Sequence, residues 1–191
     1  ITIIEYLVKY LKTSKNLDKI ILAIADTKGN DILADYAIKN KWNFIFGDEI
    51  DMLGRMIKAA NHFGSETIIQ GSTESPFLFY NNIDEVFKMH IESDFDISKT
   101  DYLPDGAGYA FFKTDTLRVS HKKGNSRHRS ELVSSYIFDN QTEFRINSVS
   151  PKKELKRSDI RITVDYPEDL VFCRKLYSNL IGKKNLIEMS D

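Results

Sequence analysis

The chain has 191 residues, of which 41% are hydrophobic and 29% charged, and its formal net charge at pH 7 is −1. This composition is typical of an ordinary globular protein that is long enough for one domain with a substantial core. The nearly neutral charge gives no reason to expect nucleic acid or an anionic membrane as a partner, and no apolar run is long enough to cross a bilayer. Cys173 is the only cysteine, which excludes an internal disulfide bond and a cysteine-based zinc site. We expect Cys173 to be a small residue of the core and the protein to be cytoplasmic.

The first half of the chain alternates helix and strand patterns. Apolar residues recur at helical spacing in some segments and form short continuous runs in others. In chain order these patterns predict a helix at 3–11, a strand at 20–25, a helix at 31–40, a strand at 42–46, a helix at 48–63, a strand at 67–70 and a helix at 82–91. We expect Ile32, Leu33 and Ile50 on the buried faces of their helices. The alternation is typical of an α/β fold in which helices flank a mostly parallel sheet with right-handed crossovers.

The second half is less regular. Its patterns predict two strands within 94–112 around the turn Pro104-Asp105-Gly106, a helix at 114–120, a basic loop at 122–129, a helix at 130–138 and a strand at 144–149. A charged connector at 152–159 follows. We expect a single domain over residues 1–181, with an irregular subregion at about 101–149, and then a polar tail at 182–191 that is frayed or a linker.

The stretch from Ile160 to Leu170 reads as a short strand, an acidic turn and the start of a helix. Apolar residues alternate with polar ones up to Val164, and Pro167 suits the first turn of a helix. Asp165 is thereby left at the carboxyl end of the strand, where ligands bind in open α/β sheets. A carboxylate at this place could hold Mg²⁺ against a phosphate. The alternative is that the acids of this stretch only cap the helix.

Four segments, taken in order, carry a resemblance to a known family. They are I-I-E-Y-L at 3–7, F-G-D-E-I-D-M-L-G-R at 46–55, G-S-T-E-S-P at 71–76 with I-D-E-V at 83–86, and I-T-V-D-Y-P-E-D-L at 162–170. The chain resembles the cytidylyltransferases grouped with the spore-coat polysaccharide protein SpsF and related to the CMP-Kdo and CMP-sialate synthetases. The resemblance covers nearly the whole chain and implies a nucleotide-diphospho-sugar-transferase-like fold.

The resemblance also implies an activity. The expected reaction is transfer of CMP from CTP to a sugar or sugar acid for cell-surface polysaccharide, with Mg²⁺ as cofactor. Relatives hold the metal with an acid in a turn after the third strand and with another in the V-D-x-P-E-D-L turn, and these positions are Glu74 and Asp165 here. Ser72 and Thr73 would direct their hydroxyls at the nucleotide. The implied partners are a nucleotide, an anionic sugar and a second copy of the chain, since relatives often dimerise through the segment that corresponds to about 101–149.

The chain departs from the family pattern in several places, among them Gly54, where a frequent Asp is replaced. Glu74 stands where relatives usually have Asp, and no acid occurs between Gly106 and Phe112, where they carry an acidic pattern. The nucleotide loop A-R-x-x-S-x-R-L-P-G-K and the strand before it are not in this sequence. We expect them upstream of Ile1, and the alternative is a copy that has lost its grip on the nucleotide.

Two further residues are candidates for catalysis. Arg55 could contact a phosphate with its forked donors, or form a surface ion pair with Asp51 four residues earlier. Glu131 matches the first position of the family segment E-x-V-T-P-Y-I. A basic cluster precedes it, which could steer an anionic sugar or simply be a solvated loop. The cluster consists of Lys122, Lys123, Arg127, His128 and Arg129.

Two other functions stay open from the sequence. The departures from the family pattern are compatible with a non-catalytic binding module of the same fold. A nucleotide-sugar glycosyltransferase is the weaker alternative, because Asp94-Phe95-Asp96 has the D-x-D form of its metal motif but follows a helix and precedes a strand.

Overall fold

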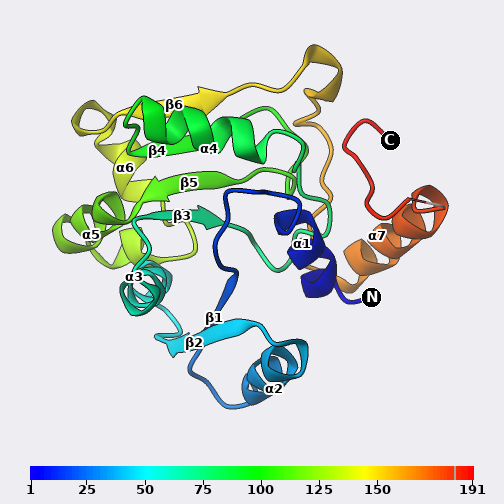
Figure 1. Ribbon diagram of the computed structural model, residues 1–191, viewed down its shortest axis with the longest axis horizontal. Coiled ribbons are helices and arrows are strands. Elements are labelled where there is room, and N and C mark those ends of the chain that lie inside the picture. The colour runs from blue at the N-terminus through cyan, green and yellow to red at the C-terminus, as the bar shows by residue number, and fades with distance from the viewer. Residues whose placement is uncertain (183) are drawn as a thin grey trace.

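Six strands in two sheets, flanked by helices, make up the described part of the chain, residues 1–182 and 184–191 of a computed structural model (Figure 1). The strands are β1 (Ile21–Ala25), β2 (Asn43–Gly47), β3 (Thr67–Gln70), β4 (Ile97–Thr100), β5 (Ala110–Lys113) and β6 (Ile146–Val149). The α-helices are α1 (Ile3–Leu11), α2 (Asp31–Asn40), α3 (Met52–Phe63), α4 (Ile83–Glu92), α5 (Thr114–Lys123), α6 (Ser135–Asp139) and α7 (Pro167–Leu180). Short 3₁₀ turns are η1 (Ser126–Arg129), η2 (Gln141–Glu143) and η3 (Lys153–Leu155).

The α/β class is confirmed, with one change in the direction of the strands. β1 and β2 form a parallel pair, and the other sheet has the order β3-β5-β4-β6. β5 runs antiparallel to both β3 and β4, so the sheet is mixed, whereas β4 and β6 are parallel. β4 and β5 are the two strands predicted around Pro104. Only a short loop joins them, and a parallel pair would have needed a long crossover.

The core lies on both faces of β5. Phe111 is fully buried in a cluster with Ile83 and Val86 of α4. Its neighbour Phe112 points to the other face and packs with Leu117 and other apolar side chains of α3, α5 and α6. Successive side chains of a strand point to opposite faces, so two adjacent phenylalanines suffice to serve two cores.

Three apolar side chains predicted to be buried are exposed. Ile50 is 80% exposed because α3 begins only at Met52. The preceding turn is held by carboxylates: Asp48 accepts from the backbone N–H of Ile50 at 2.8 Å, and Asp51 accepts from Gly54 at 2.7 Å. On α2 the buried side chains are Ala34 and Ala37, and this leaves Ile32 and Leu33 exposed.

The predicted helix at 130–138 is shorter than expected, since α6 spans only Ser135–Asp139. The chain before it is folded by local side-chain contacts instead. The Asn125 side chain accepts from Arg127 N at 3.0 Å, and Ser130 Oγ accepts from Leu132 N at 3.4 Å. Such contacts give the backbone an alternative to helical bonds.

The carboxyl-terminal residues, expected to be frayed or a linker, are anchored at Ile187. This side chain is buried, and its backbone bonds two tyrosines of α1: Tyr10 Oη donates to Ile187 O at 2.8 Å, and Ile187 N donates to Tyr6 Oη at 2.8 Å. Lys183 of the predicted tail lies outside the described residues. Cys173 on α7 is buried as expected, and its burial raises the pKa of the thiol.

Candidate active site

The stretch before α7 is extended but is not a strand of either sheet. Its contacts are with two turns: Asp105 N donates to Ile160 O at 2.8 Å, and Ile162 N donates to Asp105 O at 2.9 Å. Farther along, Val164 N donates to Glu74 O at 2.9 Å. The predicted strand at 160–164 is therefore wrong, because a ladder cannot propagate along partners that turn away. Only an isolated bridge forms, between Asp105 and Arg161.

This arrangement brings the two predicted metal-binding residues together. Asp165 follows the residue that bonds the Glu74 carbonyl, so the two acid-bearing turns lie against each other. The Glu74 side chain is exposed, and no hydrogen bond or ion pair to it occurs within the described residues. The Asp165 side chain is 46% exposed. Both carboxylates can therefore be reached by a ligand from solvent.

A glycine makes the close packing of these segments possible. Gly106 has a positive φ of 90° and lies against Thr163. A Cβ atom at this position would stand 2.8 Å from Thr163 N, which is closer than real contacts allow. The turn at 104–106 can thus support the acidic stretch only with glycine at its corner.

The capping role and the exposed carboxylate belong to different acids. Asp169 caps α7, since its Oδ2 accepts from Tyr166 N at 2.9 Å and from Asp165 N at 3.0 Å. These donors lower the pKa of the Asp169 carboxyl. The Asp165 carboxylate is not part of the cap and pairs with Arg161. Arg161 was not among the residues predicted from the sequence.

Ser72 and Thr73 lie in the same turn as Glu74. Ser75 N donates to Ser72 O at 3.1 Å and closes this turn, which follows the end of β3. Thr73 is exposed and Ser72 is half-buried. Their position next to Glu74 is compatible with the nucleotide-binding role predicted for them.

Arg55 has different contacts from those expected. Its side chain crosses Gly47 at the end of β2, and Nη1 donates to Asp48 O at 3.0 Å. The predicted ion pair with Asp51 is wrong, because that carboxylate caps α3 and contacts His121 Nε2 at 2.5 Å. Within the described part of the chain, no hydrogen bond or ion pair joins Arg55 to the acidic turns.

Glu131 is likewise not bonded to the acidic turns. It is exposed and stands before α6, and the hydrogen bonds described for this chain do not link it to either turn. The catalytic roles of Arg55 and Glu131 therefore stay predictions.

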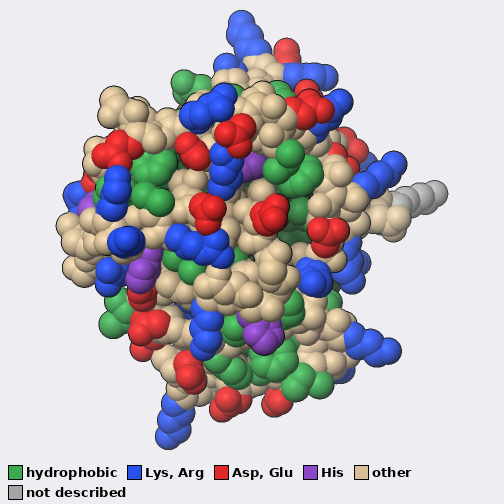
Figure 2. All heavy atoms as spheres, turned by 60° about the vertical axis from the view of Figure 1, so that its left-hand side comes forward, with side chains coloured by type: hydrophobic (Ala, Val, Ile, Leu, Met, Phe, Trp, Pro, Cys, Tyr) green, Lys and Arg blue, Asp and Glu red, His purple; other side chains and the backbone are tan. Residues whose placement is uncertain are grey.

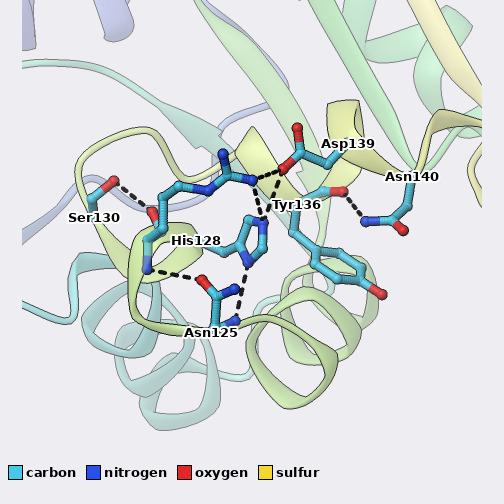
Figure 3. A network of polar contacts seen from close by, with 7 residues as sticks. Asn125, His128, Ser130, Tyr136, Asp139 and Asn140 are labelled. Atoms are coloured by element: carbon cyan, nitrogen blue, oxygen red, sulfur yellow. Dashed lines mark hydrogen bonds and ion pairs between the residues drawn. The ribbon is translucent and has the colours of Figure 1, made fainter.

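The basic cluster is largely paired within the protein. Asp139 of α6 accepts from Arg127 and from His128 Nε2, the latter at 3.0 Å. Asn125 N donates to His128 Nδ1 at 3.0 Å, and Figure 3 shows His128 between Asn125 and Asp139. Lys123 pairs with Glu143 at 2.7 Å, and Arg129 donates to the carbonyl of His121 at 3.2 Å. This pairing favours a structural role over steering of an anionic sugar.

The D-x-D pattern is also engaged internally. Lys113 Nζ lies 2.7 Å from Asp94 Oδ1 and 3.4 Å from Asp96 Oδ1. Asp96 in addition accepts from Arg145 N at 2.8 Å. These acids precede β4, whereas the turn with Glu74 follows the carboxyl end of β3. The internal pairing argues against the glycosyltransferase alternative.

The surface provides two more observations. In Figure 2, acidic and basic side chains are interspersed and the apolar ones form small separate groups. Among the helices that the structure describes, none combines the length and the apolar character that crossing a bilayer requires.

The described residues contain no group of three or more His, Cys, Asp or Glu arranged to hold a metal ion. Glu74 and Asp165 nevertheless fit a magnesium ion that is shared with a nucleotide. Mg²⁺ is typically bound by one or two carboxylates together with substrate phosphates and water. The two accessible carboxylates on adjoining turns would supply this number of protein ligands.

Comparison with known proteins shows the family to which the chain belongs. A family profile described as cytidylyltransferase matches residues 1–188. The uncharacterized protein MJ1063 of Methanocaldococcus jannaschii is 28% identical over 187 residues, which cover 98% of this chain and 75% of that protein. The spore coat polysaccharide biosynthesis protein SpsF of Bacillus subtilis is 23% identical over 164 residues, covering 85% of this chain and 68% of SpsF.

Solved structures share the fold at low sequence identity. A cytidylyltransferase from Leptospira borgpetersenii superposes with a TM-score of 0.87 at 17% identity, over 96% of this chain and 78% of that one. A CMP:2-keto-3-deoxy-manno-octonic acid synthetase complexed with CTP gives a TM-score of 0.67 at 9% identity, over 93% of this chain and 88% of its own. The chain belongs to the cytidylyltransferase family, and its fold is that of these nucleotidyltransferase enzymes.

Proposed function

We propose that this protein transfers CMP from CTP to a sugar or sugar acid that is used for cell-surface polysaccharide. The observation that carries the proposal is the hydrogen bond from Val164 N to Glu74 O at 2.9 Å, which joins the two acid-bearing turns. Family membership supports the nucleotidyltransferase chemistry. The part that SpsF has in spore coat polysaccharide biosynthesis supports the pathway, and the synthetase solved with CTP supports the nucleotide.

In the proposed reaction an oxygen of the sugar attacks the α-phosphorus of CTP, and pyrophosphate leaves with the electrons of the broken bond. Glu74 and Asp165 would hold Mg²⁺ on the phosphates. When bound, the ion would neutralise charge on the phosphate oxygens and orient them for displacement. The protein contributes mainly by positioning, because phosphate transfer depends on alignment and on charge neutralisation.

Several residues of the chain are proposed to contribute to this positioning. The Ser72 and Thr73 hydroxyls, next to Glu74, are proposed to donate to phosphate or ribose oxygens. Asp169 keeps the start of α7 fixed. It also fixes the backbone of Asp165, because it accepts a hydrogen bond from Asp165 N at 3.0 Å. Arg55 and Glu131 are proposed to act on phosphate and on the sugar.

The test is a reaction of the full-length protein with CTP, Mg²⁺ and a panel of keto-sugar acids, with pyrophosphate release as the readout. We expect release with at least one sugar acid and none without Mg²⁺. Absence of release across the panel would overturn the proposal.

A non-catalytic binding module is the second candidate. The observation in its favour is that Asp165 is paired with Arg161 rather than unpaired. This candidate predicts no rise in melting temperature on addition of CTP and Mg²⁺, whereas a ligand that binds the folded state raises that temperature. A clear shift with CTP and Mg²⁺ would exclude the non-catalytic module.

A homodimer through the segment at about 101–149 is part of the proposal. Three large apolar side chains of this segment are exposed, namely Tyr102, Val119 and Leu132. Sedimentation of the full-length protein would test this, and a monomer at all concentrations would exclude it.

A further inference from the structure

The guanidinium of Arg161 lies among three carboxylates from two separate segments. Its Nη1 is 2.9 Å from Asp169 Oδ1, its Nε is 3.8 Å from Asp105 Oδ2, and its Nη2 contacts Asp165. The guanidinium carbon of Arg161 also lies over the ring of Tyr166, 5.8 Å from its centre. The planar fork of arginine suits such multiple contacts better than lysine does.

The carboxylates on either side of the guanidinium differ in their other partners. Asp169 has two backbone N–H donors and a side chain that is only 20% exposed, so it is a fixed anchor. Asp165 is more exposed, and in the part of the chain that the structure describes its carboxylate has no hydrogen-bond donor other than Arg161. Arg161 therefore supplies the counter-charge for Asp165 while remaining anchored at Asp169.

We infer that Arg161 is a positioning residue that acts as a resident counter-ion, making divalent metal binding depend on the nucleotide. The inference rests on the proposed function, in which Asp165 holds the metal. A fixed positive charge beside a ligand carboxylate repels a free cation, and this repulsion is strong at hydrogen-bonding distances. The negative charges of a bound triphosphate reverse the balance, because they attract the metal and the guanidinium together. The metal alone then binds weakly, and the metal with CTP binds well.

The test measures binding of Mn²⁺ alone to the full-length protein by electron paramagnetic resonance, without turnover. We expect Arg161→Gln to bind Mn²⁺ about tenfold more tightly than the unmodified protein, as fits loss of one partly screened positive charge. In the same variant, CTP should strengthen Mn²⁺ binding less than it does in the unmodified protein. An unchanged or weaker affinity of Arg161→Gln for Mn²⁺ alone would overturn the inference.

Arg157→Gln is the matched control. Arg157 is an exposed arginine of the connector that precedes the stretch with Arg161, and it binds Asp159 through Nε and Nη2, both at 2.8 Å. The Arg157→Gln substitution removes the same charge without touching Asp165, so the affinity for Mn²⁺ alone should stay within about twofold of that of the unmodified protein. An equal gain in both variants would mean that net charge alone sets the affinity, and this too would overturn the inference.

Two further variants keep the test decisive if Arg161→Gln folds poorly. Arg161→Lys retains the positive charge but not the fork, and should bind Mn²⁺ alone within about threefold of the unmodified protein. The double variant Arg161→Gln with Asp165→Asn should lose the gain, because the freed carboxylate is gone. A tighter Arg161→Lys, or a gain that survives in the double variant, would contradict the counter-ion role.

Failure of the inference and failure of the proposed function give different results. If Asp165→Asn leaves binding of Mn²⁺ with CTP unchanged, the metal role of Asp165 falls, and the inference falls with it. If Asp165→Asn abolishes that binding but Arg161→Gln does not tighten binding of Mn²⁺ alone, only the inference falls.

Discussion

The core around β5 is stabilised in a different way from the acidic edge, the place where the turn with Glu74 meets the extended stretch before Asp165. β5 is covered on both faces by apolar side chains, and Phe111 is inaccessible to solvent. The edge is instead held by backbone hydrogen bonds between the extended stretch at 160–164 and two turns, and by ion pairs at half-exposed carboxylates. The difference teaches that stability and activity should be separable in this protein, since few groups serve both.

The largest effect on activity is expected at the edge, for Asp165→Asn. Loss of one metal carboxylate should lower the rate of CMP transfer on the order of a thousandfold, in the range found for removal of a single electrostatic contact in an active site. The melting temperature should change little, because Arg161 keeps its contacts with Asp169 and Asp105. Pyrophosphate release and thermal unfolding are the two measurements.

Asp159→Asn is the control for this variant. Asp159 is an exposed acid that is likewise paired with an arginine, Arg157, but it lies outside the acidic turns. Its activity should remain within about twofold of the unmodified protein. A similar loss in both variants would mean that the acid at 165 has no special role, and the comparison between edge and core would fail.

The opposite effect is expected in the core, for Phe111→Ala. Truncation of this buried ring should lower the free energy of unfolding by about 3–4 kcal/mol through lost burial and a cavity. The rate of the protein that remains folded should be nearly unchanged. Denaturant unfolding gives the first quantity, and activity per folded molecule gives the second.

Phe172→Ala provides the matched comparison. This ring on α7 is half-exposed, so its truncation should cost less than about 0.5 kcal/mol. If Phe172→Ala destabilised the protein as much as Phe111→Ala, the exposed face of α7 would have to be covered in solution.

A third prediction concerns a titrating group in the core. His90 is fully buried on α4, and its Nδ1 lies 3.0 Å from Ser98 Oγ. Burial, together with the charge of Lys113, lowers the pKa of His90 from 6.5 to about 4. The unfolded chain therefore binds a proton at a pH where the folded one does not, and stability should fall as the pH drops from 6.5 towards 4.

This loss should amount to about 2–3 kcal/mol for the unmodified protein, on top of the contributions of other groups. In His90→Gln the part due to this residue should disappear, although the variant starts from a lower stability. The control His62→Gln alters an exposed histidine of α3 and should keep the full acid dependence. Denaturant unfolding at a series of pH values separates the two. An unchanged acid dependence in His90→Gln would show that the ring titrates normally.

Local sequence patterns allowed some of these features to be predicted. Asp165 follows an alternating apolar pattern, and Pro167 marks the start of α7, so this acid could be placed at the end of an extended segment. Glu74 is identified only by the resemblance to the cytidylyltransferases and not by a local pattern. The order of most helices and strands followed from periodicity for the same reason.

Other features depend on contacts that local patterns do not contain. Ile50 fits a helical stripe, but capping by Asp48 and Asp51 delays the helix beyond it. Arg161 contacts Asp105, which is remote in sequence, and its spacing to Asp165 carries no signal outside a helix. The direction of β5 is set by the short loop before it, which the alternation of strands and helices does not reveal.

The smallest effect is expected for the second acid of the edge. Glu74→Gln should raise the Mg²⁺ concentration needed for half-maximal activity by about tenfold, while the rate at saturating Mg²⁺ is largely restored, since one carboxylate and the triphosphate still hold the ion. Glu74→Asp keeps the charge but shortens the side chain by one methylene, so its requirement for Mg²⁺ should lie between those of Glu74→Gln and the unmodified protein. Glu154→Gln removes the charge of another exposed acid, in η3, and should leave the requirement unchanged. If Glu74→Gln behaved like Glu154→Gln, the hydrogen bond between Val164 and Glu74 would be a packing contact alone. Asp165, positioned by Arg161, would then be the one metal ligand of the two acidic turns.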